Sequence, residues 1–145
     1  MAEIGFYHMT RSSAEQALPP LLGRTLAAGQ RALVLCADAE RVAAIDTTLW
    51  TSADWLPHGT AETGSPELQP IWIATDAANP NAAAFLFLLD GTTTDLTPFT
   101  RVFDLFDGNN PDSVQSARNR WRAAKAEGHT LTYWQQTERG WEKKA

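Results

Sequence analysis

The chain has 145 residues, of which 43% are hydrophobic and 20% charged, a composition typical of an ordered globular protein rather than a disordered one. Its 12 Lys and Arg against 17 Asp and Glu give a formal net charge of −5, which disfavours non-specific binding to duplex DNA or to an anionic membrane. The single cysteine excludes an internal disulfide, and no stretch reaches the ~20 apolar residues of a membrane helix. We therefore expect one α/β domain over residues 1–145, located in the cytoplasm.

The first third of the chain alternates between strand-like and helical patterns. An apolar run at residues 4–8 predicts a strand, and the leucines of Leu18–Leu26 then share one face of a helix that Gly29 can end. Pro19 and Pro20 conflict with an uninterrupted helix, because a proline in a helix interior costs about 3 kcal/mol. Ser12 with Glu15, or Ser13 with Gln16, has the spacing of a capping box and indicates a helix start before these prolines. We expect either a kink at the prolines or a regular helix that begins near Pro19, and we favour the second.

A second strand–helix unit follows directly. Residues 32–36 form a continuous apolar run, the pattern of a strand that is covered on both faces. Asp38 can cap a helix in which Val42, Ile45 and Leu49 recur at i, i+3 and i+7. Two such units within about fifty residues predict a parallel sheet with right-handed crossovers.

Polar, glycine- and proline-containing residues from 51 to 69 predict a loop. Apolar runs then predict strands at residues 71–74, 85–89 and 102–106, followed by a helix over 112–127 and a last strand at 131–134. The predicted fold class is α/β, with a Rossmann-like, mostly parallel sheet and helices on both faces. No nucleotide-binding loop is expected, because neither a G-x-G-x-x-G nor a Walker A motif is present.

The sequence offers no set of catalytic residues. The three histidines lack metal-ligand spacing, so neither a metal nor another cofactor is expected. Cys36 ends an apolar strand and is interpreted as a buried, inert thiol. Asp104 and Asp107 could form a carboxylate pair, but solvated acids at a strand end are the favoured interpretation. A small α/β enzyme or nucleotide binder, with a site at the carboxyl ends of the strands, is kept as an alternative function.

Charge is distributed unevenly along the chain. Residues 1–97 carry four Lys and Arg against eleven Asp and Glu, whereas residues 98–145 carry eight against six. In the last predicted helix, Arg118, Arg122 and Lys125 flank an apolar stripe that holds Trp121. Cations beside an indole favour an acidic ligand with an aromatic group. The alternatives are a solvated helix face and direct binding of single-stranded DNA.

Motifs along the whole chain resemble one known family, the chi subunit of bacterial DNA polymerase III. They are, in chain order, Phe6-Tyr7, Gly29–Leu35, Leu49-Trp50, Leu56–Gly59, Gln69–Ile73, Phe106–Gly108, Ala117–Trp121, Gly128-His129, Tyr133–Gln136 and Gly140–Glu142. No single motif is diagnostic, and the resemblance rests on their number and order.

The resemblance implies a non-catalytic accessory subunit of the DNA polymerase III holoenzyme with a Rossmann-like fold. It implies that the psi subunit links this chain to the clamp loader, and that DNA is contacted indirectly. It also implies binding to the acidic C-terminal tail of single-stranded DNA-binding protein, which ends in Pro-Phe with a free carboxylate.

The tail-binding residues implied by the resemblance lie mainly on the last helix. They are Arg118, Trp121 and Arg122, with Trp50, Trp55 and Phe106 as apolar walls; we add Lys125 at the rim from its spacing. The C-terminal aromatic residues Tyr133, Trp134 and Trp141 are candidates for a surface that faces the psi subunit, in a heterodimer rather than a homodimer.

Overall fold

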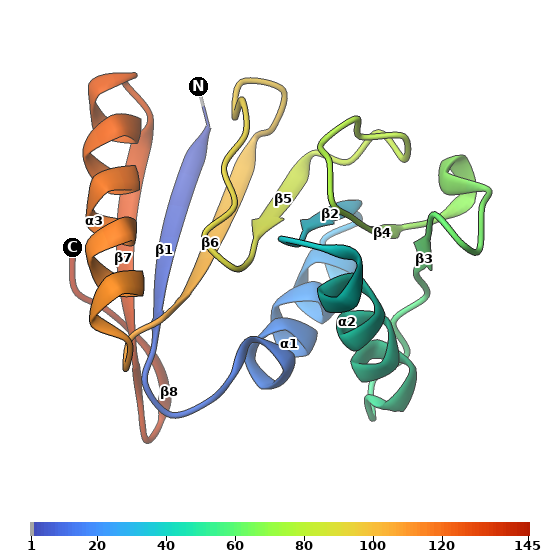
Figure 1. The fold of residues 1–145 in the computed structure, drawn as a ribbon, viewed down its shortest axis with the longest axis horizontal. Coiled ribbons are helices and arrows are strands. Elements are labelled where there is room, and N and C mark those ends of the chain that lie inside the picture. Colours follow the sequence, from blue (N-terminus) through green and yellow to red (C-terminus); the bar gives the residue numbers. More distant parts are fainter. Residues whose placement is uncertain (1) are drawn as a thin grey trace.

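The computed structural model describes residues 2–145, in which three α-helices pack on an eight-stranded sheet (Figure 1). The elements are β1 (Glu3–Met9), α1 (Ala14–Ala27), β2 (Ala32–Leu35), α2 (Ala39–Thr51), β3 (Gly59–Thr60), β4 (Ile71–Ala74), β5 (Phe85–Leu88), β6 (Arg101–Asp107), α3 (Pro111–Ala126), β7 (Thr130–Thr137) and β8 (Gly140–Lys143), with a 3₁₀ turn at Pro66–Leu68. The strand order is β3-β4-β2-β5-β6-β1-β7-β8, and only β8 runs antiparallel to its neighbour. The predicted α/β fold with a mostly parallel sheet is therefore confirmed.

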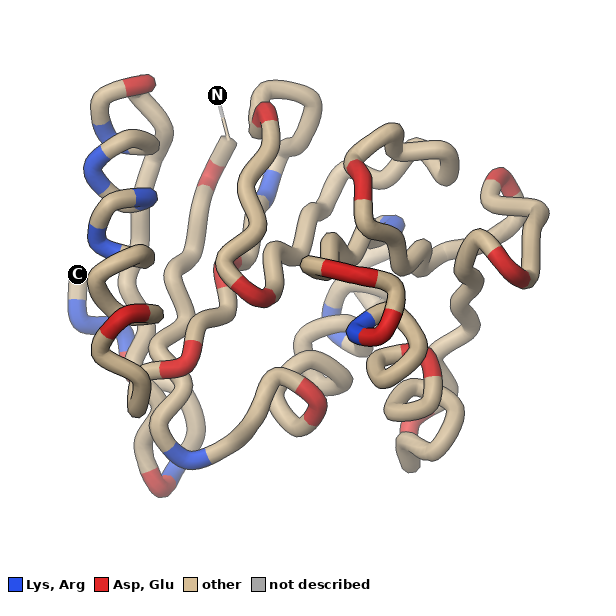
Figure 2. Tube along the Cα trace, in the orientation of Figure 1, with Lys and Arg blue, Asp and Glu red and all other residues tan. Residues whose placement is uncertain are grey.

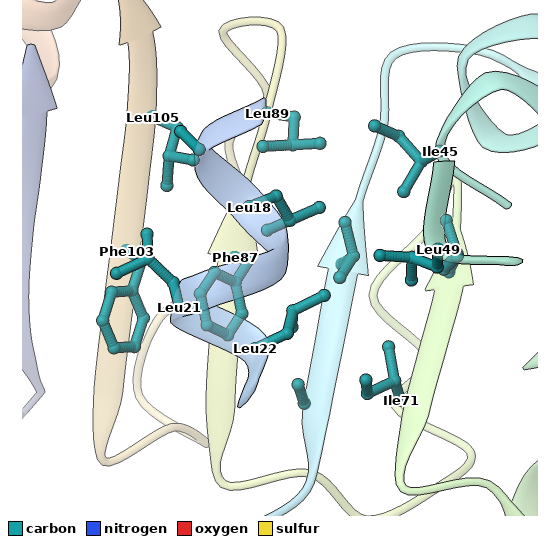
Figure 3. Close-up of a cluster of buried hydrophobic side chains, with 14 of the residues drawn as sticks. Leu18, Leu21, Leu22, Ile45, Leu49, Ile71, Phe87, Leu89, Phe103 and Leu105 are labelled. Carbon is teal, nitrogen blue, oxygen red and sulfur yellow. The ribbon is translucent and has the colours of Figure 1, made fainter. Parts of the chain in front are cut away.

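The sheet buries apolar side chains on both faces, because successive residues of a strand point to opposite sides. In β1, Tyr7 and Met9 belong to the cluster beneath α1 and α2, whereas Ile4 and Phe6 belong to the cluster beneath α3. Figure 3 shows the first cluster, whose labelled members are Leu18, Leu21, Leu22, Ile45, Leu49, Ile71, Phe87, Leu89, Phe103 and Leu105. The two sheet faces thus carry separate cores and separate outer surfaces.

Local signals set the helix ends as the sequence predicts. The Asp38 carboxylate accepts a hydrogen bond from the Arg41 N–H at 2.9 Å and caps α2. Gly29 and Gly128 follow α1 and α3 with φ of 75° and 88°, a left-handed conformation that glycine adopts without steric cost.

Helix α1 begins at Ala14, directly after the capping-box residue Ser13, and not near Pro19 as the favoured prediction had it, so both prolines lie in its interior. Gln16 Oε1 accepts the Ser13 N–H at 3.1 Å, which favours helix initiation at this point. Leu18, on the first turn and a half, is fully buried. Capping and burial of the leucine face therefore outweigh the backbone hydrogen bonds that the prolines remove.

The C-terminal segment also differs from its prediction. The last predicted strand extends to Thr137 and turns back as β8, a strand that the sequence pattern did not predict. The rings of Trp134 and Trp141 pack on Tyr7, with centroid distances of 6.0 and 5.0 Å. Both indoles are half-buried in the fold, so each keeps part of its surface exposed.

A buried ion pair joins β6 to α3. Arg120 Nε and Nη2 donate to the two carboxylate oxygens of Asp104 at 2.6 and 3.0 Å, and the side chains are only 11% and 3% exposed. Burial raises the pKa of the Asp104 carboxyl, and the Arg120 guanidinium opposes that shift. The expectation of a solvated acid is wrong for Asp104, which is buried and paired with Arg120. The sequence pattern does not indicate this pair, because the two residues lie sixteen positions apart. Asp107 is exposed, as expected.

We predict that Asp104→Asn destabilises the fold by about 3–5 kcal/mol, because it leaves the Arg120 guanidinium buried without its counter-charge. Urea unfolding followed by circular dichroism measures the change. Asp107→Asn, at the exposed end of the same strand, is the control and should stay within about 0.5 kcal/mol of the parent chain. Equal stabilities for Asp104→Asn and the parent chain would contradict this account of the ion pair.

Candidate functional site

A pocket of about 300 Å³ lies beside α3, on the sheet face that this helix covers. Its lining residues come from α3 and from three neighbouring strands; they are Phe6, Phe106, Val114, Ala117, Arg118, Trp121, Arg122 and Tyr133. Six of the eight are apolar or aromatic, so the pocket has an apolar interior with charge only at Arg118 and Arg122.

Aromatic contacts fix the walls of the pocket. The Trp121 ring meets Phe6 edge-on at a centroid distance of 5.2 Å and Tyr133 at 6.1 Å. Phe6 and Phe106 are buried, while Trp121 and Tyr133 are half-buried and still present surface to the pocket. Such a box of rings can receive another ring by stacking or edge contact.

The two arginines of the pocket are exposed, and neither forms an ion pair within residues 2–145. Figure 2 shows the basic residues of α3 grouped along the helix, whereas acidic residues predominate around α1 and α2. Burial raises the pKa of the Tyr133 hydroxyl, and the nearby Arg118 charge partly offsets this shift. The pocket is therefore suited to an anionic group attached to an apolar or aromatic one.

The structure brings together four of the predicted tail-binding residues and separates three others. Arg118, Trp121, Arg122 and Phe106 line the pocket, whereas Lys125 lies exposed, almost one turn farther along α3. Trp50 and Trp55, the predicted apolar walls, are not part of the pocket. They are 68% and 82% exposed, on α2 and in the loop that follows it, and α2 packs on the opposite sheet face.

Phe6 and Tyr133 line the pocket but were not predicted from the sequence. They are directly paired across β1 and β7, so they point to the same face of the sheet. The alternation of strand residues indicates which side chains of one strand share a face of the sheet. It relates Tyr133 to Phe6 only when β1 and β7 are known to be neighbours and their register is known.

His8 contacts Tyr133, which forms one wall of the pocket. Its Nδ1 contacts the Tyr133 hydroxyl, and its Nε2 lies 3.3 Å from the carbonyl oxygen of Gly108. A side chain at position 108 would collide with the imidazole ring, because its Cβ would lie 1.8 Å from His8 Cδ2. Gly108 is therefore required for the close approach of the β6–α3 turn to His8.

A larger crevice, of about 630 Å³, lies at the carboxyl ends of β1 and β6, where α/β proteins often bind ligands. Its charged lining residues are Glu15, Arg41, Asp90, Asp107, Asp112 and Arg120. Arg41 contacts Glu15 and Asp90, and Arg120 holds Asp104, so both cations are already paired. This lining opposes a phosphate group.

The backbone N–H groups of the loop between β1 and α1 already have a hydrogen-bond partner within the chain. In nucleotide-binding proteins of this architecture its backbone N–H groups face the phosphates. Here Gln136 Oε1 accepts hydrogen bonds from the N–H groups of Thr10, Arg11 and Ser12 at 3.2, 2.9 and 3.1 Å. The crevice therefore gives no support to the nucleotide-binding alternative.

Other reactive groups show no arrangement for catalysis among the residues described. The Cys36 thiol is 1% exposed, which confirms the prediction of a buried cysteine, and burial raises its pKa to about 12. Across residues 2–145 no three His, Cys, Asp or Glu side chains cluster as a metal site would require. No helix in this range has the length and apolar character needed to cross a membrane.

Comparison with known proteins agrees with the resemblance. The sequence profile of the DNA polymerase III chi subunit family (HolC) matches residues 1–132. A curated relative, the probable DNA polymerase III subunit chi of Rickettsia prowazekii (strain Madrid E), is 26% identical over 94 residues, which span 63% of this chain and 57% of that relative. The chain belongs to the DNA polymerase III chi subunit family, a family of non-catalytic accessory subunits.

Proposed function

We propose that this chain is an adaptor in DNA replication that connects the clamp loader to single-stranded DNA-binding protein. One of its surfaces binds the acidic C-terminal tail of that protein, and a second surface binds the psi subunit. The observation that carries the proposal is the α3 pocket, in which aromatic walls stand beside two exposed arginines that form no ion pair within residues 2–145. A replication subunit works on the chromosome, so we place this function in the cytoplasm.

The chemistry of the tail complements the pocket group by group. The terminal phenylalanine ring fits among the rings of Phe106, Trp121 and Tyr133. Arg118 can form a forked pair with the terminal carboxylate, and charge-assisted hydrogen bonds of this kind contribute about 1.5–3 kcal/mol each. Arg122, one turn along α3, and then Lys125 can attract the aspartates upstream, where salt screens the interaction.

We propose that the psi subunit binds on the opposite side of the sheet. Trp50 and Trp55 are the most exposed large apolar side chains within residues 2–145 besides Leu68. Trp55 also borders a hollow of about 430 Å³ against α1, lined by Pro20, Gly23 and neighbouring residues. Exposed tryptophans beside a hollow are the usual composition of a protein interface. Two partners bound on opposite faces can be held at the same time, as an adaptor requires.

We predict that Arg118→Glu weakens binding of an acidic peptide ending in Pro-Phe by about 2–5 kcal/mol, because it removes the partner of the terminal carboxylate and adds a repulsive charge. Arg122→Ala should cost less and mainly reduce the salt dependence. Isothermal titration calorimetry at several salt concentrations measures both changes.

Two controls make this experiment specific. Arg139→Glu changes the net charge equally, on the exposed β7–β8 turn, and should bind the peptide as the parent chain does. A peptide with an amidated C-terminus should bind the parent chain weakly. Arg118→Glu should weaken binding of this amidated peptide little further, because amidation and the substitution both break the same contact, the one between Arg118 and the terminal carboxylate. Full peptide affinity of Arg118→Glu at low salt, or tighter binding of an oligonucleotide than of the peptide, would refute the proposed tail site.

We predict that Trp55→Ala weakens binding to the psi subunit by at least about 2 kcal/mol, as is usual for a tryptophan at the centre of an interface. The fold should persist, because the side chain is 82% exposed. Surface plasmon resonance with immobilised psi subunit measures the affinity.

The matched control for this variant is Leu68→Ala, which removes an apolar side chain of similar exposure outside the Trp50–Trp55 surface. Both variants should retain the tail affinity of the parent chain. If Trp55→Ala and Trp50→Ala both bind the psi subunit normally, the psi surface lies elsewhere while the tail site is unaffected.

A further inference from the structure

The sheet continues beyond the α3 pocket through its C-terminal segment. Tyr133 of β7 lines the pocket, and the residues that follow β8 pair with it from the outer side. Lys144 N–H donates to the carbonyl oxygen of Tyr133 at 2.8 Å, and Tyr133 N–H donates to the Ala145 oxygen at 3.2 Å. This segment therefore lies next to a wall of the pocket, at the spacing of about 4.8 Å that is usual for paired strands.

The register of the strand pair decides which side chains share the face of the pocket. Residues directly opposite each other in an antiparallel pair point to the same side of the sheet. Glu142 is opposite Gln135, and Lys144 follows opposite Tyr133, so both lie on the α3 side. Their ion pair, with Lys144 Nζ 3.2 Å from Glu142 Oε1, agrees with this placement, because alternate residues of a strand share a face.

The intervening residues of the segment lie on the other face of the sheet. Trp141 packs edge-on against Tyr7, which belongs to the cluster beneath α1 and α2. Lys143 is opposite Trp134, whose ring stacks on the same tyrosine. Lys143 and Lys144 are therefore adjacent lysines on opposite faces of the sheet, and only Lys144 is on the side of the pocket.

Lys144 adds a third cation beside the pocket. Arg118 and Arg122 border the pocket from α3, whereas Lys144 lies beyond Tyr133, on the edge of β7 that faces away from β1. Figure 2 shows the basic residues of the C-terminal segment beside the basic turns of α3. The pocket thus has positive charge on two sides, which complements a ligand with several acidic groups next to its aromatic one.

The ion pair of Lys144 leaves the lysine available to a ligand. The side chain of Lys144 is 46% exposed and that of Glu142 is 57% exposed. Exposed ion pairs of this kind contribute little to stability, so a carboxylate of a ligand can replace Glu142 at small cost. Glu142 therefore competes with an acidic ligand for Lys144.

We propose that Lys144 is a second contact for the acidic residues of the peptide that the α3 pocket binds. The terminal aromatic residue of the peptide lies among the rings of the pocket, and the acidic residues before it cross β7 between the α3 arginines and Lys144. This inference rests on the tail site proposed above. Lys144 lies after residue 132, where the match to the chi family profile ends, so the contact belongs to a part of the chain outside that match.

The test compares charge changes at three neighbouring positions. Isothermal titration calorimetry with an acidic peptide ending in Pro-Phe is carried out at about 0.1 M salt, where the Debye length is about 10 Å. Lys144→Glu should weaken binding about three- to tenfold, since one attraction is replaced by a repulsion. Glu142→Gln should strengthen binding about twofold, because it removes the competing carboxylate.

Lys143→Glu is the matched control for Lys144→Glu. It changes the net charge equally at the adjacent position, but on the other face of the sheet. Its affinity for the peptide should stay within about twofold of the parent chain, because the solvent screens a charge at that distance. At about 1 M salt the difference between Lys144→Glu and the parent chain should also disappear.

Two altered peptides locate the contact along the ligand. When serine and asparagine replace the acidic residues of the peptide, Lys144→Glu should lose its effect, because the partner of Lys144 is gone. With the amidated peptide, Lys144→Glu should keep its effect, because Arg118 and not Lys144 meets the terminal carboxylate. The opposite pattern would place Lys144 at the carboxylate and overturn the proposed path of the peptide.

Lys144→Ala protects the comparison if Lys144→Glu disturbs the strand pair, since it removes the charge without adding a repulsion. It should weaken binding about two- to threefold. Equal affinities for both Lys144 variants, Lys143→Glu and the parent chain, while Arg118→Glu binds weakly, would overturn the role of Lys144 and leave the tail site intact. If Arg118→Glu binds the peptide as the parent chain does, the tail site itself fails, and the role of Lys144 fails with it.

Discussion

The carboxylate of Asp104, buried beneath α3, constrains the rotation of that helix about its axis. It holds Arg120 by two hydrogen bonds on the sheet side of the helix. A step of two residues turns about 200° around a helix axis, so Arg118 and Arg122 both lie away from Arg120, on the flank of α3 that borders the pocket. One helix thus uses three arginines for two purposes, because Arg120 holds the helix to β6 and Arg118 and Arg122 are exposed at the pocket.

The same sheet keeps the two proposed binding surfaces apart. A parallel sheet must be covered on both faces, and here α3 covers one face while α1 and α2 cover the other. The aromatic box belongs to the α3 face, and the exposed indoles of Trp50 and Trp55 belong to the α2 side. An adaptor built in this way needs no movement to hold two partners, because neither surface borrows residues from the other.

The sequence predicts the features that depend on neighbouring residues. Apolar runs locate the main strands, the last helix is predicted within a residue of each end, and Asp38 is identified as a cap. It does not predict which sheet face a helix covers, because helical periodicity defines an apolar side but not the layer that it meets. For that reason Trp50 and Trp55 were expected beside Arg118, although the structure places them on the other side of the sheet. The Asp104–Arg120 pair was missed for a similar reason, since nothing near Asp104 in the sequence reveals its partner.

In the loop after β1, a side chain of the protein itself takes the place that a phosphate group has in nucleotide-binding proteins of this architecture. Three consecutive N–H groups are available there, and in a nucleotide-binding protein they would meet phosphate oxygens. Gln136 supplies an uncharged oxygen to all three, and its Nε2 donates to Ser12 Oγ at 2.7 Å. The extension of β7 beyond its predicted end is what brings Gln136 to this loop. The residues that lengthen the sheet thus supply the hydrogen-bond partner of this loop, and the pocket beside α3 lies on a different part of the chain.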